Sequence, residues 1–158
     1  MDVSFNTLFG AINRKPISMV LPLWIGLKED AEWMFPVEPL ISISGSNVVV
    51  KRNVAKSEHI GTIKERWAQD DFSINIQGAF VHPDLHTYPE NDVQTLLYYI
   101  GQKRALSVKN ELFAMLNIQQ IVIESFSLPF TKGENVQNFT IDATSDSLYE
   151  LFIEVKNV

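Results

Sequence analysis

A chain of 158 residues with 46% hydrophobic and 20% charged residues is long enough for one folded domain and unlike a disordered protein. Its 13 Lys and Arg residues against 19 Asp and Glu residues give a formal net charge of −6. Because an acidic surface repels phosphate, we expect no nucleic-acid binding. The absence of cysteine excludes disulfides, thiolate metal sites and cysteine nucleophiles.

The first 37 residues are rich in large apolar side chains and proline and lack clear periodicity. Their most apolar stretch, residues 17–27, contains Pro22 and is too short to span a bilayer. The amino terminus also lacks the basic region of a signal peptide, so we expect no membrane association. We therefore divide the chain into an apolar, proline-punctuated N-terminal arm (1–37) and a β-rich core domain (38–158).

Four aromatic residues of this arm are candidate contact residues for a neighbouring subunit: Phe5, Trp24, Trp33 and Phe35. Such residues either cover the sheet as part of the core or anchor the arm in another chain, since aromatic side chains dominate both kinds of contact. The sequence leaves both alternatives open.

Two β-hairpins are predicted next. Residues 41–44 alternate apolar and polar, and a turn at 45–47 leads them into 48–52. A second hairpin would join residues 60–67 to 72–80 through the polar turn at 69–71.

Residues 72–80 show the clearest alternation in the chain. Their apolar side chains on one face are Phe72, Ile74, Ile76 and Phe80. Gly78 interrupts this row, which predicts a bulge or a close approach of another segment.

An amphipathic helix is predicted to end at Lys103 and Arg104, with an apolar stripe at Val93, Leu96, Leu97 and Ile100. Thr87 and Glu90 match a capping box at its start. A second, short helix is predicted over residues 107–116, with the inward side chains Leu112, Met115 and Leu116.

Further strands are predicted at residues 119–128, 136–144 and 149–155. Several connections are too short for parallel crossovers, which favours antiparallel pairing. The predicted fold class is α+β and predominantly antiparallel β, with a twisted sheet or partly closed barrel and one main helix packed against it.

The best candidate for metal chemistry is the segment with His82, Asp84 and His86, whose imidazoles and carboxylate suit zinc. A closed site would need another ligand, such as Asp71, Glu90 or His59, and surface-loop histidines are the alternative interpretation. There is no G-x-S-x-G, P-loop or dinucleotide-binding motif. We predict no catalytic, cofactor-binding or metal-binding residues.

Several short motifs resemble a family of small, largely uncharacterised phage and prophage proteins. The resemblance covers roughly residues 40–147 and includes KRNV (51–54), GTIKE (61–65) and DDFSINIQG (70–78). More distantly, the sequence is similar to baseplate and tail proteins of contractile phages and injection systems.

This resemblance implies a non-enzymatic structural component of a phage or phage-like tail, as a baseplate, hub or tail-terminus subunit. It implies a ring-type homo-oligomer that contacts other tail proteins, made in the bacterial host cytoplasm and located in the virion tail. An alternative hypothesis is a monomeric binding module or inhibitor of a host protein. A third is a metal-dependent hydrolase that uses His82, Asp84 and His86.

Overall fold

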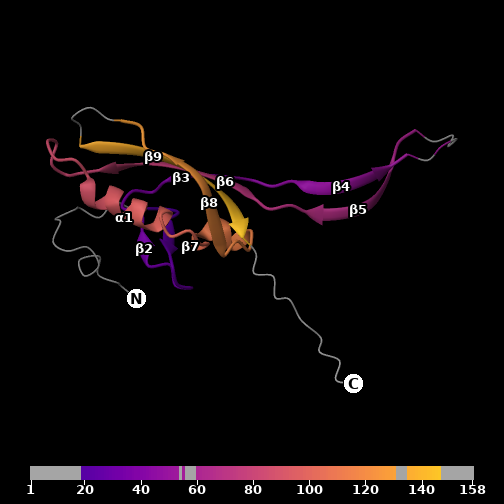
Figure 1. Cartoon of the computed structure of the whole chain (residues 1–158), viewed down its shortest axis with the longest axis horizontal. Coiled ribbons are helices and arrows are strands. Elements are labelled where there is room, and N and C mark those ends of the chain that lie inside the picture. Colours follow the sequence, from indigo (N-terminus) through magenta and orange to yellow (C-terminus); the bar gives the residue numbers. More distant parts are fainter. Residues whose placement is uncertain (1–18, 54, 56–59, 131–134, 147–158) are drawn as a thin grey trace, which may run out of the picture.

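The computed structural model describes residues 19–53, 55, 60–130 and 135–146, so the strand predicted at 149–155 lies outside it. Figure 1 shows a compact body from which one pair of strands extends. In chain order, the elements are β1 (Trp24–Gly26), β2 (Trp33–Met34), β3 (Leu40–Ser44), β4 (Asn47–Arg52), β5 (Ile63–Gln69), β6 (Ser73–Val81), α1 (Glu90–Ile100), β7 (Leu106–Lys109), α2 (Glu111–Met115), β8 (Gln120–Ser127) and β9 (Val136–Asp146).

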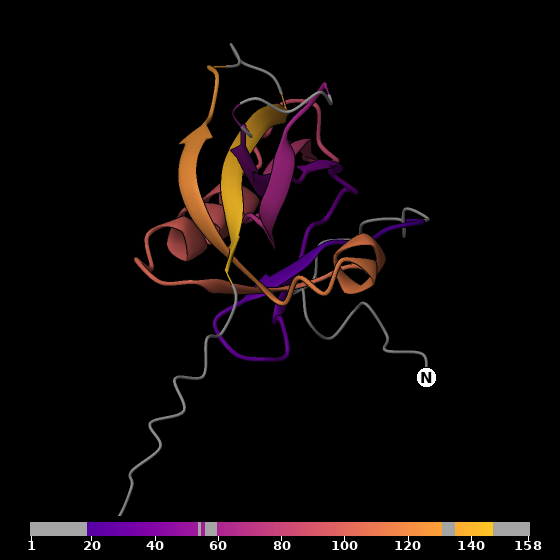
Figure 2. The ribbon, with the colours of Figure 1, turned by 90° about the vertical axis from the view of Figure 1, so that its right-hand side faces the viewer.

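Seven strands form one sheet in the order β2-β1-β7-β8-β9-β6-β3, and all its neighbouring pairs are antiparallel. The longest ladder joins β6 to β9, from Ser73 opposite Thr144 to Val81 opposite Val136. Figure 2 shows the sheet curving from β6, β9 and β8 towards β7 and β1. The sheet stays open, with β2 and β3 at its edges. The predicted α+β fold with a twisted antiparallel sheet is confirmed.

The core lies between this sheet and α1, and it follows the alternation that the sequence predicts. In β6 the side chains of Ile74, Ile76 and Phe80 are buried, while Phe72 packs partly buried against the same cluster. Phe139 and Ile141 of β9 are buried opposite them. Burial of these large apolar side chains is the main free-energy gain of folding.

Gly78 marks a close approach and not a bulge, because the β6–β9 ladder runs through it without a shift. A Cβ atom at this position would lie 2.7 Å from Cζ of Phe139, its partner on β9. The glycine therefore lets the Phe139 ring lie directly over the strand, which settles one of the two sequence alternatives.

The two predicted hairpins are wrong in their partners. β3 pairs with β6, and β4 pairs with β5, so residues 40–52 and 63–77 form one long hairpin. At Gly45 and Ser46 the chain bends but does not reverse direction. The backbone N–H of Asp70 donates to the Ser46 carbonyl (2.9 Å), so the two arms of the hairpin stay paired through the bend. The turn-forming residues face each other across the hairpin, so they produce a shared bend.

The predicted helix at 107–116 is also too long. Residues 106–109 form β7, in which Leu106 and Val108 are buried, and α2 begins only at Glu111. Asn110 caps it, since its side-chain oxygen accepts from the backbone N–H of Leu112 (2.9 Å). Phe113 is the buried residue of α2, whereas Met115 is exposed. The apolar residues at 112, 115 and 116 resembled a stripe, but the short helix turns a different face inward.

The main helix is confirmed, but the predicted capping box is wrong. α1 begins at Glu90 with Pro89 as its N-cap, which makes no side-chain capping bond. The Thr87 hydroxyl donates to the carboxylate of Asp84 (2.7 Å) because the preceding loop folds back on itself. Val93 and Leu96 are buried as expected, but Leu97 is 40% exposed and Tyr99 is buried in its place.

Replacing Phe35, which is fully buried, should test the core directly. We expect Phe35→Ala to lower the free energy of unfolding by about 3–5 kcal/mol, since it leaves a cavity in the core. The matched control is Phe130→Ala, which removes a ring that is 90% exposed and should change stability by less than about 0.5 kcal/mol. Urea unfolding measures both, and equal effects would show that Phe35 is not a core residue.

Candidate interaction surface

The structure places the four predicted contact residues in different environments. Trp33 and Phe35 are buried within the chain itself, with their ring centroids 4.7 Å apart, so they keep little surface for another subunit. Trp24 is half-buried in β1, and Phe5 lies outside the described residues. Subunit contact by Trp24 and Phe5 stays a prediction.

Residues 24–35 do not form a separate arm. β1 pairs with β2 and with β7 of the core domain, and Leu23 and Ile25 belong to the same buried cluster as β6 and β9. The side chain of Asn110 also donates to the carbonyls of Leu21 and Pro22 (both 3.0 Å). Within the described residues, therefore, no structural boundary falls at residue 37. The sequence pattern did not reveal these strands, because β1 and β2 are only three and two residues long and prolines interrupt the segment.

The histidine segment forms a loop held by its own hydrogen bonds. The carboxylate of Asp84 accepts from the backbone N–H of His86 (3.1 Å) and the hydroxyl of Thr87 (2.7 Å). These two bonds, that from Thr87 first, hold the pKa of Asp84 below its ordinary value. His82 Nδ1 accepts from the Asp84 backbone N–H (3.1 Å). Across the described chain, no three His, Asp or Glu side chains converge as a metal site would need, and His59 lies outside it.

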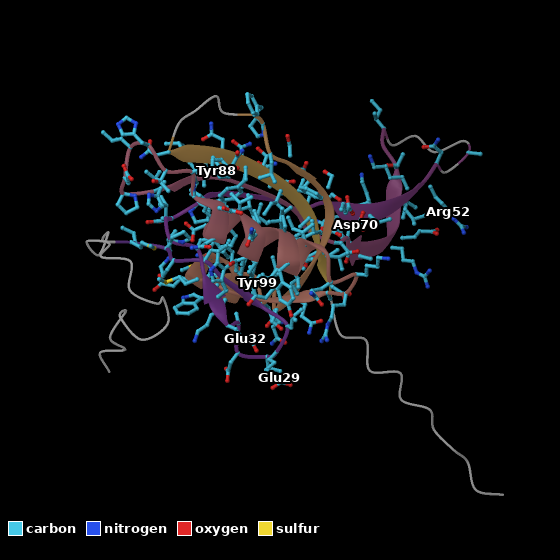
Figure 3. The ribbon with its side chains drawn as sticks, turned by 60° about the vertical axis from the view of Figure 1, so that its left-hand side comes forward. Glu29, Glu32, Arg52, Asp70, Tyr88 and Tyr99 are labelled. Atoms are coloured by element: carbon cyan, nitrogen blue, oxygen red, sulfur yellow. The ribbon has the colours of Figure 1, made fainter. Side chains whose placement is uncertain are left out.

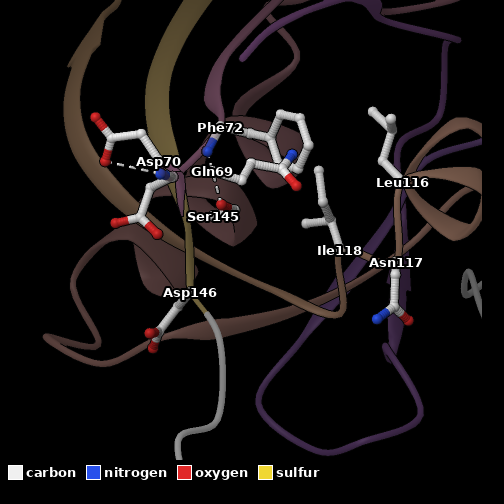
Figure 4. Close-up of a pocket in the computed structure, with 9 residues that line it drawn as sticks. Gln69, Asp70, Phe72, Leu116, Asn117, Ile118, Ser145 and Asp146 are labelled. Atoms are coloured by element: carbon white, nitrogen blue, oxygen red, sulfur yellow. Dashed lines mark hydrogen bonds between the residues drawn. The ribbon is translucent and has the colours of Figure 1, made fainter. Parts of the chain in front are cut away.

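A cavity of about 310 Å³ lies where the bent hairpin meets the body (Figure 4). The backbone N–H of Phe72 donates to the Ser145 hydroxyl (2.9 Å), and that of Asp71 donates to the Asp70 carboxylate (3.0 Å). The other polar residues that line the cavity are Gln69, Asn117 and Asp146. No imidazole or amine lines this cavity to activate Ser145 as a nucleophile, so its hydrogen bonds serve to fix the base of the hairpin.

The most unusual surface is the ribbon formed by β4 and β5. These two strands form a separate two-stranded sheet, and Figure 1 shows them extending away from the body. Every residue of β5 is exposed, and within β4 only Val49 is partly buried. A two-stranded hairpin of this kind is marginally stable in water, because both its faces and both its edges are solvated.

Apolar side chains occupy both faces of this β4–β5 ribbon. Val49 lies opposite Trp67 on one face, and Trp67 is 72% exposed. Val48, opposite Ala68, and Val50 lie on the other face, and both valines are exposed. Exposed aromatic and branched residues on a projecting element are typical of a surface that binds another protein.

The ribbon is also basic, with Lys51, Arg52, Lys64 and Arg66 among its described residues. Glu65 forms an ion pair with Arg52 (2.8 Å), but the exposure of both side chains means that it adds little stability. Figure 3 shows Arg52 far out on the ribbon, with its side chain directed into solvent. The basic side chains are therefore available for a partner of opposite charge.

Sequence reasoning did not identify Trp67 as a contact residue. The signal that could have found it is the composition of β5, IKERWAQ, in which charged residues surround the tryptophan and no apolar row repeats. A strand of a half-buried sheet shows such a row, as β6 does. Its absence indicates a strand without a core face.

The chain belongs to a protein family whose model, described as "Domain of unknown function (DUF6046)", matches residues 34–156. This confirms the resemblance to an uncharacterised family that the motifs over residues 40–147 indicate. No curated protein matches the chain. Within the described residues, no helix has the length and apolar character needed to cross a membrane.

Among solved structures, the chain is similar to the Dit protein (gp 19.1) of SPP1, described as a paradigm of the hub adsorption apparatus in phages that infect Gram-positive bacteria. The TM-score is 0.54 at 9% sequence identity, which shows a common fold. The match covers 81% of this chain and 50% of Dit, so the chain corresponds to half of that protein.

Two weaker matches come from gene transfer agent particles. One is in the virion of the native particle, with 13% identity and a TM-score of 0.46, and the other is in the tail of the empty particle, with 15% identity and a TM-score of 0.41. Each covers 79% of this chain and 91% of the other. These TM-scores are too low to support a fold assignment.

Removing the β4–β5 ribbon should leave the body intact. The variant replaces residues 48–68 with Asn-Gly, so that a tight two-residue turn connects Asn47 to its strand partner Gln69. Because β4 and β5 pair with each other outside the main sheet, the free energy of unfolding should change by less than about 1 kcal/mol. Thermal and urea unfolding measure this, and loss of the cooperative transition would show that the body needs the ribbon.

Proposed function

We propose that this protein is a non-enzymatic structural component of a phage or phage-like tail, which assembles with other copies of itself and with neighbouring tail proteins. The observation that carries the proposal is the β4–β5 ribbon. It projects from a well-packed body and exposes Trp67, Val48 and Val50. Exposed apolar side chains on a ribbon that no described residue covers are suited to binding by another chain.

The fold supports the same function. The body shares its fold with Dit, a phage hub protein, over 81% of this chain. The match covers only half of Dit. The position of this protein in the hub, the baseplate or the tail terminus is therefore proposed and does not follow from the shared fold. Subunits of such assemblies require a stable body and complementary surfaces, and cyclic repetition of one contact closes a ring.

The described surface offers no competing chemistry. No imidazole or amine lines the cavity at the base of the hairpin, and Asp84 is engaged by the turn that contains His86 and Thr87. We therefore place function in the binding surfaces, with Trp24 and Phe5 as further proposed contacts to a neighbouring subunit. The location that follows is the virion tail, reached after synthesis in the bacterial host cytoplasm.

The experiment that tests this function compares two single variants in purified particles from a strain that carries the gene. We expect Trp67→Ser to reduce the amount of this chain per particle at least tenfold, because a desolvated aromatic anchor contributes about 2 kcal/mol or more to a protein interface. Met115→Ser is the matched control, since Met115 is equally exposed but lies on α2. Quantitative mass spectrometry against the tail-tube protein measures incorporation.

Two results would contradict the proposal. The first is absence of the natural chain from intact particles, which would favour a monomeric binder of a host protein. The second is equal incorporation of both variants, which would show that the ribbon does not attach the protein to the tail. Urea unfolding of the purified variants distinguishes either result from misfolding.

A further inference from the structure

A second exposed apolar surface lies at the end of the body opposite the ribbon. Four exposed apolar side chains lie at this end, Val81 on the outer face of β6 and Leu85, Tyr88 and Phe130 beyond the ends of the strands, and we call this group the distal patch. Figure 1 places the end of β6 and the start of β9 at this end, away from β4 and β5. Figure 3 shows Tyr88 and Arg52 at opposite ends of the molecule.

The distal patch is built on a rigid base. The Tyr88 hydroxyl donates to the side-chain oxygen of Gln137 (2.6 Å), and the Gln137 side chain donates in turn to the carbonyl of Pro129 (2.7 Å). Gln137 is buried and joins the loop before α1 to the end of β8. A buried, satisfied amide of this kind fixes the segments that it connects. The positions of Tyr88 and Phe130 therefore follow from the fold.

The charge of the distal patch is opposite to that of the ribbon. Asp84 and Glu90 lie beside the patch, and Glu90 also lines a hollow of about 150 Å³ together with Tyr88. The carboxylate of Asp84 is exposed and held in place by Thr87.

The charge of the whole chain divides in the same way. Residues 47–69 contain five basic and two acidic residues, a net charge of +3, which leaves −9 for the rest of a chain whose total is −6. Pairing of two ribbons would bring two positive surfaces together, whereas a contact between the ribbon and the distal patch brings opposite charges together. Electrostatic complementarity therefore favours the second arrangement.

We propose that the β4–β5 ribbon of one copy binds the distal patch of a second copy, so that the chains associate head to tail. Val48 and Val50, which share a face of the ribbon with Ala68, would cover the distal patch, while Arg66 and Lys64 of the same face would lie against the acidic rim. Because the two surfaces differ and lie at opposite ends, the contact is heterologous, and its repetition produces a closed ring or a filament. This inference rests on the proposed function, for which it names the self-assembly contact.

Site-directed cross-linking tests the contact, since the natural chain has no cysteine that could react alongside the introduced one. One preparation of the full chain carries Ala68→Cys on the ribbon, and a second preparation of different mass carries Val81→Cys in the distal patch. After mixing and treatment with a short bifunctional maleimide, we expect the mixed dimer to exceed each homodimer at least fivefold. Met115→Cys, an equally accessible position outside both surfaces, measures collisional cross-linking.

A charge exchange provides an independent readout. Arg66→Glu alone and Glu90→Lys alone should each lower the yield of the mixed dimer several-fold, and mixing the two variants should restore it, since opposite charges then face each other again. A predominant homodimer through residue 68, or a mixed dimer no more abundant than the Met115→Cys background, would overturn the proposed contact. Unchanged yields in all charge variants would also contradict it.

Failure of this inference is distinguishable from failure of the proposed function. If the chain occurs in particles but the purified protein gives no cross-link between residues 68 and 81, the tail function stands and the head-to-tail contact is wrong. If the cross-link forms but intact particles lack the chain, the contact stands and the tail function is wrong.

Discussion

The stacking of aromatic rings between the sheet and α1 is the interaction on which the rest of the structure depends. Phe80 and Phe139 pack with ring centroids 4.7 Å apart, and Phe35 lies 5.5 Å from Phe139. Trp33 contacts Phe35 and stacks on Tyr99 of α1 at 5.9 Å. These contacts join the amino-terminal strands, the two central strands and the main helix, and such pairs contribute beyond the area they bury.

This cluster makes the body independent of the ribbon. The body buries its large apolar side chains in one continuous core, whereas β4 and β5 contribute none of the residues in that core. The hairpin is fixed at its base by the bonds of Asp70 to Ser46 and of Phe72 to Ser145, and beyond that point it is solvated. A rigid body with an anchored, apolar projection separates the requirements of folding from those of assembly.

The fold class and most of the core were predictable, because apolar residues that alternate in β6 and β9 face one side by backbone geometry alone. Strand partners were not predictable from the same signal. Residues 45–47 and 69–71 carry turn-forming side chains, but they lie opposite each other in one hairpin and only bend it. The burial of Trp33 and Phe35 was left open, since strands of two or three residues show no period.

The binding surfaces were predicted less well than the fold. Trp67 stands among charged residues in the sequence, and only the pairing of β5 with β4 shows that no other described strand covers either face of the ribbon. The distal patch combines residues 81–88 with the distant Phe130, and no apolar period marks either segment in the sequence. Surfaces formed by distant segments depend on the tertiary structure, whereas periodicity reports only local structure.

Hydrogen exchange of the β4–β5 amides, compared between the isolated protein and intact particles, tests the central claim most directly. In the isolated protein, kept dilute enough to be monomeric, these amides should exchange at least tenfold faster than those of β6 and β9, because the ribbon contributes no residue to the core. In particles, the ribbon amides should become as protected as those of the body, since another chain then covers the ribbon. Equally fast exchange of the ribbon in particles would contradict assembly through this surface.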